Sequence, residues 1–224
     1  MLTPVRAYDA HARTYLDWTY AVDAAYVPPD LVTVSTGAAV QVTPFALPQL
    51  TAADLRALPG EAAYGALLVD DPNAAVRQVM LPDLRALRAS AQAAGVPLVV
   101  LSAYRSYAHQ VATFDHWVRV GGYEQALRTS ARPGHSEHQL GTAIDFGDGR
   151  AAPWEYRDWA TTSSGAWLRE HAAAFGFVMS YPPGRSGVTC YDYEPWHYRW
   201  IGRTAASALL AAGVTLREWQ TVTR

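Results

Sequence analysis

The stretch of the chain that decides the fold is Ser136–Asp145, which reads SEHQLGTAID. His138 lies at the end of a predicted loop, and Asp145 lies inside a strand predicted over residues 142–146. Between them, Gly141 permits a backbone bend or close approach that residues with a Cβ resist. We therefore expect the His138 imidazole and the Asp145 carboxylate to converge on one point. Alternatively, His138 is a hydrogen-bonded packing residue and Asp145 is a turn former.

A second stretch, Glu194–His197, reads EPWH and supplies a third candidate ligand in His197. Three nitrogen or oxygen ligands that leave one position open are typical of a catalytic zinc site. Pro195 is disfavoured inside a sheet, so we expect the last strand to begin after it, which lets Glu194 turn back toward the metal. A carboxylate that does not bind the metal is suited to act as the general base. The complementary residue types of the two stretches predict a catalytic zinc site.

The composition fits one folded domain, or one domain with extensions. Of the 224 residues, 50% are hydrophobic and 17% are charged, which is enough apolar material for a sizeable core. The formal net charge of -2 gives no reason to expect a nucleic-acid or anionic-membrane partner. No apolar run is long enough to span a membrane. We expect a monomer.

Two residue types leave alternatives open. The 8 Trp and 13 Tyr residues either pack in and around the core or line a groove. Cys190 is the only cysteine, so an internal disulfide is impossible. A cysteine nucleophile is conceivable, but no base motif accompanies Cys190, and we interpret it as structural or incidental.

Hydrophobic periodicity predicts an α+β fold, because helices and strands are mixed without regular alternation. Helices are expected over about Arg6–Ala25, from Ala52, from after Asn73 to Gly95, from after Ser106 to Gly121, over 163–175 and over 204–212. Strands are expected over 97–101, 142–146, 177–181 and 196–201. Residues 1–50 should form an N-terminal helix and an extended arm packed on the body, and residues 51–224 a single catalytic unit.

Several blocks of sequence occur in the order that one known family shows. They are Val27–Leu31 (VPPDL), Ser102–Ser106 (SAYRS) with Gln110, Pro133–Gln139 (PGHSEHQ), and Glu194–His197 followed by Arg199. With these blocks the chain resembles the zinc D-alanyl-D-alanine carboxypeptidases of the vancomycin-resistance type, which are LAS-type metallopeptidases. The resemblance runs from about Leu16 to the C-terminal helix. It implies a small central antiparallel sheet flanked by helices, a hedgehog/DD-peptidase-like fold shared with the sonic hedgehog signalling domain.

The resemblance also implies how the metal is held. His138, Asp145 and His197 match the ligands of one zinc ion per chain, and Glu194 matches the catalytic base. One departure from the family pattern is Trp200, where a tyrosine is more often expected. This change is conservative and leaves the site assignment as it stands.

Three further positions match residues that contact the substrate in the family. Arg105 matches the cation that polarises the scissile carbonyl and steadies the oxyanion, a role that suits a permanently charged guanidinium. Ser136 and Gln110 match polar groups that hold the C-terminal end of the substrate. A short peptide with a free terminal carboxylate fits these groups.

The implied activity is removal of the C-terminal D-alanine from peptidoglycan stem peptides, by a D,D- or an L,D-carboxypeptidase. One alternative is a peptidoglycan endopeptidase, of the endolysin or autolysin kind, that cuts within the stem. Another is a non-catalytic zinc-binding interaction domain, which would need neither Glu194 nor Arg105. No signal peptide is recognisable after Met1. The implied substrate leads us to expect a location in the periplasm or cell wall, with an export signal or lipoprotein anchor ahead of Met1.

Overall fold

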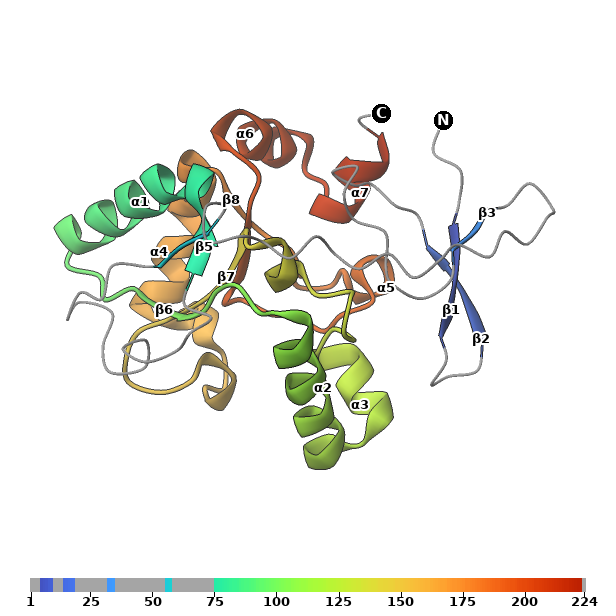
Figure 1. Cartoon of the computed structure of the whole chain (residues 1–224). Coiled ribbons are helices and arrows are strands. Elements are labelled where there is room, and N and C mark those ends of the chain that lie inside the picture. Colours follow the sequence, from blue (N-terminus) through green and yellow to red (C-terminus); the bar gives the residue numbers. More distant parts are fainter. Residues whose placement is uncertain (1–4, 10–13, 19–31, 35–54, 58–74, 223–224) are drawn as a thin grey trace. The chain divides into compact units, whose positions relative to one another are not determined.

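The computed structural model describes residues 5–9, 14–18, 32–34, 55–57 and 75–222 (Figure 1). The chain divides into two compact units, of which the larger comprises residues 50–216. The smaller comprises residues 1–49 and 217–224. Helix α7, Leu216–Val222, begins at the boundary between them. Within the described residues, no helix combines the length and the apolar character that crossing a membrane requires.

A four-stranded antiparallel sheet forms the centre of the larger unit, with strand order β6-β7-β9-β8. Its strands are β6 Val99–Ser102, β7 Ala143–Gly147, β8 Phe177–Met179 and β9 His197–Trp200. β7 is buried along its whole length, as expected for a central strand. The register pairs Asp145 with Ser102 on one side and with His197 on the other. The sheet therefore brings residues from distant parts of the sequence next to each other.

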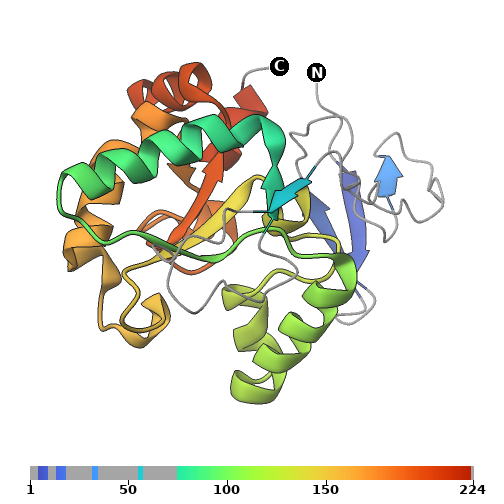
Figure 2. The ribbon, with the colours of Figure 1, turned by 60° about the vertical axis from the view of Figure 1, so that its left-hand side comes forward.

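Helices surround this sheet (Figure 2). The α-helices of the unit are α1 Leu81–Ala93, α2 Tyr107–Gly121, α3 Tyr123–Thr129, α4 Ser163–His171, α5 Ser186–Thr189 and α6 Arg203–Ala212. Short 3-10 turns are η2 Gln78–Met80, η3 Glu137–Leu140, η4 Pro153–Glu155, η5 Trp159–Thr161 and η6 Ala172–Phe175. In both views α2 and α3 lie side by side, at the opposite end of the unit from α6.

The core is one cluster of buried residues from α1, the sheet, α4 and η6. Leu84, Leu87 and Ala91 recur at helical spacing on α1 and are all buried. The Phe146 ring of β7 packs edge-on against the rings of Phe177 and Tyr198, at centroid distances of 6.1 and 6.0 Å. These contacts fix the central strands against each other, and with them the residues at the strand ends.

The expected α+β class and the strands of the sheet are confirmed. β6, β7, β8 and β9 all fall within or one residue beyond the ranges predicted for them. The expected helices are found as α1, α2, α4 with η6, and α6. α1 starts later than expected, because Ala75–Arg77 forms a strand, β5, before it. The sequence does not predict the short helix α3, because the Gly121–Gly122 pair is typical of the end of a helical segment.

The N-terminal helix expected over Arg6–Ala25 is wrong where the structure describes it. β1, Val5–Asp9, and β2, Thr14–Trp18, pair as antiparallel strands, and β3, Val32–Val34, pairs with the other edge of β1. Large apolar side chains in short segments fit helical and extended periodicity alike. The backbone register sets Tyr8 opposite Tyr15, and tyrosine has a high strand propensity. Residues 19–25 lie outside the described residues, and packing of the arm on the body stays a prediction.

The short helix expected from Ala52 is also wrong at its described end. Leu55–Ala57 is a strand, β4, that pairs antiparallel with β5. The pairing satisfies the backbone of a segment too short to be a stable helix on its own. Residues 51–54 lie outside the described residues.

Candidate active site

Strand pairing places Asp145 and His197 directly opposite each other on β7 and β9. The Nδ1 atom of His197 lies 2.9 Å from Oδ1 of Asp145. Both side chains are buried. β9 begins at His197, so the expectation that the strand starts after Pro195 is confirmed. The sheet itself thus builds the first two members of the predicted ligand set.

His138 reaches the same point from η3, which ends at Gly141 in the left-handed region with φ 68°. This conformation favours glycine and turns the chain from η3 into β7. The His138 Nδ1 lies 2.6 Å from the carbonyl oxygen of Ala103, to which it donates its proton. Its Nε2 lies 3.1 Å from Asp145 Oδ2 and has no hydrogen-bond partner among the described residues.

Electrostatics agree with a neutral His138. Burial, and next the Arg105 charge, lower the pKa of His138 to about 4, although Asp145 opposes them. At neutral pH the Nε2 lone pair then faces a carboxylate oxygen that also carries lone pairs. Two buried acceptor atoms that face each other with no proton or cation between them are unfavourable. A metal ion between the two atoms would relieve this repulsion.

The ligand atoms of His138, Asp145 and His197 all lie within 4.8 Å of one another. Two imidazole nitrogens and one carboxylate oxygen suit zinc, and three protein ligands leave a position for water or substrate. The carbonyl of Ala103 supports one imidazole from behind, as is usual for metal-binding histidines. The residues present therefore fit the predicted metal.

Glu194 lies in the turn that precedes β9, with its carboxylate 3.9 Å from Nδ1 of His197. The turn is fixed by hydrogen bonds from Glu194 N–H to the Tyr181 carbonyl and from His197 N–H to the Glu194 carbonyl, both 3.1 Å. The pKa of Glu194 is raised to about 8, mainly because the carboxyl group is buried. Nearby charges act in both directions, since His197 and Arg105 lower this pKa whereas Asp145 and Glu137 raise it. A carboxylate that titrates near neutral pH is suited to take and return a proton.

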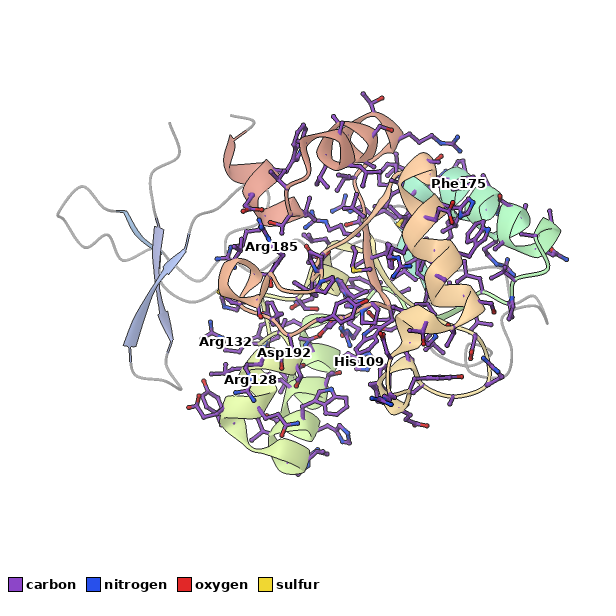
Figure 3. The ribbon with its side chains drawn as sticks, turned by 180° about the vertical axis from the view of Figure 1, so that it is seen from behind. His109, Arg128, Arg132, Phe175, Arg185 and Asp192 are labelled. Carbon is purple, nitrogen blue, oxygen red and sulfur yellow. The ribbon has the colours of Figure 1, made fainter. Side chains whose placement is uncertain are left out.

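The loop that carries Glu194 is tied to α3. Arg128 Nε lies 3.5 Å from the Asp192 carboxylate, and Asp192 N–H donates to the Arg128 carbonyl at 2.9 Å. Figure 3 shows these two side chains next to each other at the edge of the α2–α3 pair. The position of Glu194 is thus set from both sides, by the sheet and by this helix pair.

Of the predicted substrate-contacting residues, Arg105 lies at the ligand group. Its backbone N–H donates to the His138 carbonyl at 3.2 Å, and its positive charge lowers the pKa of both His138 and Glu194. Its side chain is half-buried. A cation in this position can stabilise negative charge that develops beside the metal ligands.

Gln110 and Ser136 are both buried. The amide nitrogen of Gln110 donates to the Ala131 carbonyl at 2.6 Å, and its Oε1 has no hydrogen-bond partner in the described part of the chain. Gln110 thus ties α2 to the loop before η3, whereas Ser136 immediately precedes η3. Substrate contacts of either residue stay predictions.

Sequence reasoning missed the role of Glu137 at this site. Its Oε2 lies 2.9 Å from Nε2 of His197 and accepts a hydrogen bond from the Ser180 hydroxyl at 2.6 Å. Oε1 accepts from Arg199 Nη1 at 3.2 Å. Burial would raise the pKa of Glu137, but Arg199, His197 and Ser180 together lower it to about 2. The sequence did contain one signal for this role, namely an acidic residue next to a predicted ligand within the motif.

The His197 side chain is therefore constrained from several directions. Burial would lower its pKa, but the hydrogen bonds and charges of Asp145 and Glu137 raise it to about 10 in the absence of a metal. The ring of Tyr181 also stacks on the His197 ring, with centroids 4.9 Å apart. The imidazole is held at both nitrogens and on one face.

Comparison with known proteins finds similarity over the part of the chain that holds this candidate site. The family model for VanY, D-alanyl-D-alanine carboxypeptidase, matches residues 73–203, which is more than half of the chain. A D-alanyl-D-alanine carboxypeptidase of Enterococcus faecalis is 36% identical over 150 residues, which cover 62% of this chain and 53% of that protein. The chain spans about half the length of the first curated relatives that it matches.

Solved structures extend the similarity to the fold. The LdcB LD-carboxypeptidase superimposes with a TM-score of 0.63 and 30% identity, covering 74% of this chain and 76% of that one. A mutant of the vancomycin-resistance D,D-pentapeptidase VanY, solved in complex with Zn(II), gives a TM-score of 0.58 and 31% identity, covering 65% and 83%. The expected fold, a small antiparallel sheet flanked by helices as in these carboxypeptidases, is confirmed.

Proposed function

Because the chain belongs to the VanY D-alanyl-D-alanine carboxypeptidase family, we propose that it is a zinc-dependent carboxypeptidase that removes the terminal D-alanine from peptidoglycan stem peptides. The observation that carries the proposal is the buried group of His138, Asp145 and His197, with the Glu194 carboxylate beside it. The Zn(II) complex of a related VanY supports zinc as the metal. A protein that only bound zinc would not need a carboxylate with a raised pKa at this position.

The residues of the site divide the chemistry between them. When bound by the three ligands, zinc supplies a Lewis acid that polarises a carbonyl and acidifies water. Glu194 takes the proton from the attacking water and passes it to the leaving amine of the terminal D-alanine. Arg105 pairs with the negative charge that forms on the carbonyl oxygen as the peptide bond breaks. The products are the shortened peptide, with a new carboxylate, and free D-alanine.

Ser136 and Gln110 are proposed to hold the terminal carboxylate of the substrate. A hydroxyl and a primary amide both donate hydrogen bonds, and one hydrogen of the Gln110 amide remains after its bond to Ala131. Because both residues are buried, a substrate that reaches them is largely shielded from water. Such a site strongly favours a charged chain end over a neutral one.

D,D- and L,D-carboxypeptidases are both among the similar structures, including an L,D-carboxypeptidase DacB of 34% identity. The stereochemistry of the residue before the scissile bond is therefore left to experiment. We propose a location outside the cytoplasm, in the periplasm or cell wall, because polymerised peptidoglycan is there. We further propose that the protein works as a monomer.

The test is to incubate the zinc-loaded protein with a stem pentapeptide ending in D-Ala-D-Ala and, separately, with the matching tetrapeptide ending in one D-Ala. Mass spectrometry of the products identifies the bond cut. Loss of one D-alanine from the pentapeptide alone supports D,D-activity, and loss from the tetrapeptide supports L,D-activity. Cleavage only within the stem would favour the endopeptidase alternative, and no cleavage of either peptide by the zinc-loaded protein would contradict the proposal.

A further inference from the structure

The imidazole of His197 lies between two carboxylates that face its two different nitrogens. Nδ1 is 2.9 Å from Asp145 Oδ1, and Nε2 is 2.9 Å from Glu137 Oε2. A histidine offers a metal only a nitrogen that carries no proton, and its other nitrogen is then the donor of a hydrogen bond. Which carboxylate accepts that bond therefore decides which nitrogen binds the metal.

The neighbours of each nitrogen identify the metal side. Asp145 and Glu194 lie on the Nδ1 side, with Glu194 Oε2 3.9 Å from that atom. The His138 ring is also close to the His197 ring, with centroids 5.0 Å apart. Asp145 and His138 are the other members of the ligand group, so Nδ1 is the nitrogen that faces the metal position. Glu137 is left on the far side, at Nε2.

We propose that Glu137 is a positioning residue whose carboxylate accepts the Nε2–H of His197, and so fixes the tautomer that leaves Nδ1 available to the metal. The inference rests on the proposed function, because it assumes the metal site of that function. Carboxylate–histidine–metal arrangements orient the ring and make the ligand nitrogen more basic. Here the residue next to one ligand, His138, would support another ligand, His197.

The carboxylate of Glu137 is itself held in one orientation. Oε1 accepts from Arg199, which lies two residues after His197 on β9 and so on the same side of that strand. Oε2 accepts from the hydroxyl of Ser180, the residue that follows β8. Because each oxygen has its own donor, the group facing His197 cannot rotate away without losing a charge-assisted hydrogen bond.

This arrangement predicts the effect of an isosteric substitution. In Glu137→Gln, Arg199 requires an acceptor, so the amide oxygen turns toward Arg199 and the amide NH2 turns toward His197. The His197 Nε2 must then accept a hydrogen bond, which moves its proton to Nδ1, the nitrogen that the metal needs. Removal of Arg199 as well, in Glu137→Gln/Arg199→Met, lets the amide oxygen face His197 again. The double variant should therefore recover part of what the single variant loses.

The experiment measures zinc affinity by chelator competition for the metal-free wild type, Glu137→Gln, Glu137→Gln/Arg199→Met and the control Glu170→Gln. Glu170 is an exposed carboxylate on α4. We expect affinity to fall about 10- to 100-fold in Glu137→Gln, to recover partly in the double variant, and to stay unchanged in the control. An unchanged affinity in Glu137→Gln would overturn the inference.

A second measurement on the wild type does not depend on how well the variants fold. Nitrogen-15 NMR of the imidazoles in the zinc-loaded protein reports which nitrogen of His197 carries the proton. A proton on Nε2 supports the inference, and a proton on Nδ1 overturns it while leaving the carboxypeptidase proposal in place. Absence of zinc binding by the wild type would instead overturn the proposed function, and this inference with it.

Discussion

Asp145 and His197 face each other across β7 and β9, and their side chains meet with Nδ1 of His197 2.9 Å from Oδ1 of Asp145. Two candidate ligands on neighbouring antiparallel strands are held rigidly, because the backbone hydrogen bonds of the sheet fix their separation. His138 comes from η3 and not from the sheet, and the Ala103 carbonyl holds its ring. The candidate metal site is thus built mainly by the register of the sheet.

This pairing predicts that zinc uptake releases a proton. Without metal, the carboxylates on either side raise the pKa of His197 to about 10, so at pH 7 both of its nitrogens are protonated. Binding at Nδ1 requires loss of that proton, so affinity should fall as the pH is lowered from 8 to 6. Calorimetry in two buffers with different heats of ionisation counts the protons released. We expect about one or more per zinc, and none would show that His197 is not a ligand.

Substitution of Glu194 should separate catalysis from metal binding. Glu194→Gln removes the proton acceptor but keeps the size of the side chain, so zinc content should be retained. The rate of D-alanine release should fall by a factor on the order of 10²–10⁴, the usual contribution of a general base. Steady-state kinetics and metal analysis on the same sample test this. A zinc-loaded variant with near-normal turnover would assign the base to another residue.

The state of the substrate's terminus should control the rate. If Ser136 and Gln110 hold a terminal carboxylate, amidation of that carboxylate leaves buried donors unpaired. We expect a stem pentapeptide with a free D-Ala-D-Ala end to be cut far faster than its C-terminal amide. Liquid chromatography of the two reactions at equal enzyme concentration gives the ratio. Equal rates would point to an endopeptidase that does not read the chain end.

Core packing under the sheet can be tested apart from the chemistry. Leu84 on α1 is 1% exposed, whereas Leu210 on α6 is 65% exposed. Leu84→Ala should lower the free energy of unfolding by about 2–5 kcal/mol, because it removes buried methyl groups and leaves a cavity. Leu210→Ala, the same substitution on the surface, should change it by less than about 0.5 kcal/mol. Denaturant unfolding of both variants measures the difference, and equal effects would contradict the assigned core.

The sequence indicated which side chains come together at the candidate site, but not which residues hold them in place. His138, Asp145 and His197 were recognisable because their residue types and the intervening Gly141 restrict what the motif can do. Glu137 was not assigned a role, because its partner Arg199 lies on β9 and its partner Ser180 directly follows β8, both far from Glu137 in sequence. Contacts between segments that are distant in sequence depend on the order and register of the sheet, which no local pattern determines.

The N-terminal elements were mispredicted for a related reason. The aromatic residues of 5–18 satisfy a helical spacing over a few turns, but pairing between β1 and β2 decides their conformation. In β9, by contrast, Pro195 limited where the strand could begin, and the prediction was correct. Residues that restrict the backbone strongly, such as Pro195, therefore predicted element boundaries better than the spacing of apolar residues did.

The most direct test of the account is the zinc-to-protein ratio of the wild type and of His138→Ala/His197→Ala, determined by elemental analysis of protein prepared without added metal. We expect about one zinc per wild-type chain and almost none in the double variant, because a single carboxylate holds zinc weakly. Circular dichroism of the double variant checks that its fold is retained. Equal zinc in a folded double variant and the wild type would contradict the assignment of this site.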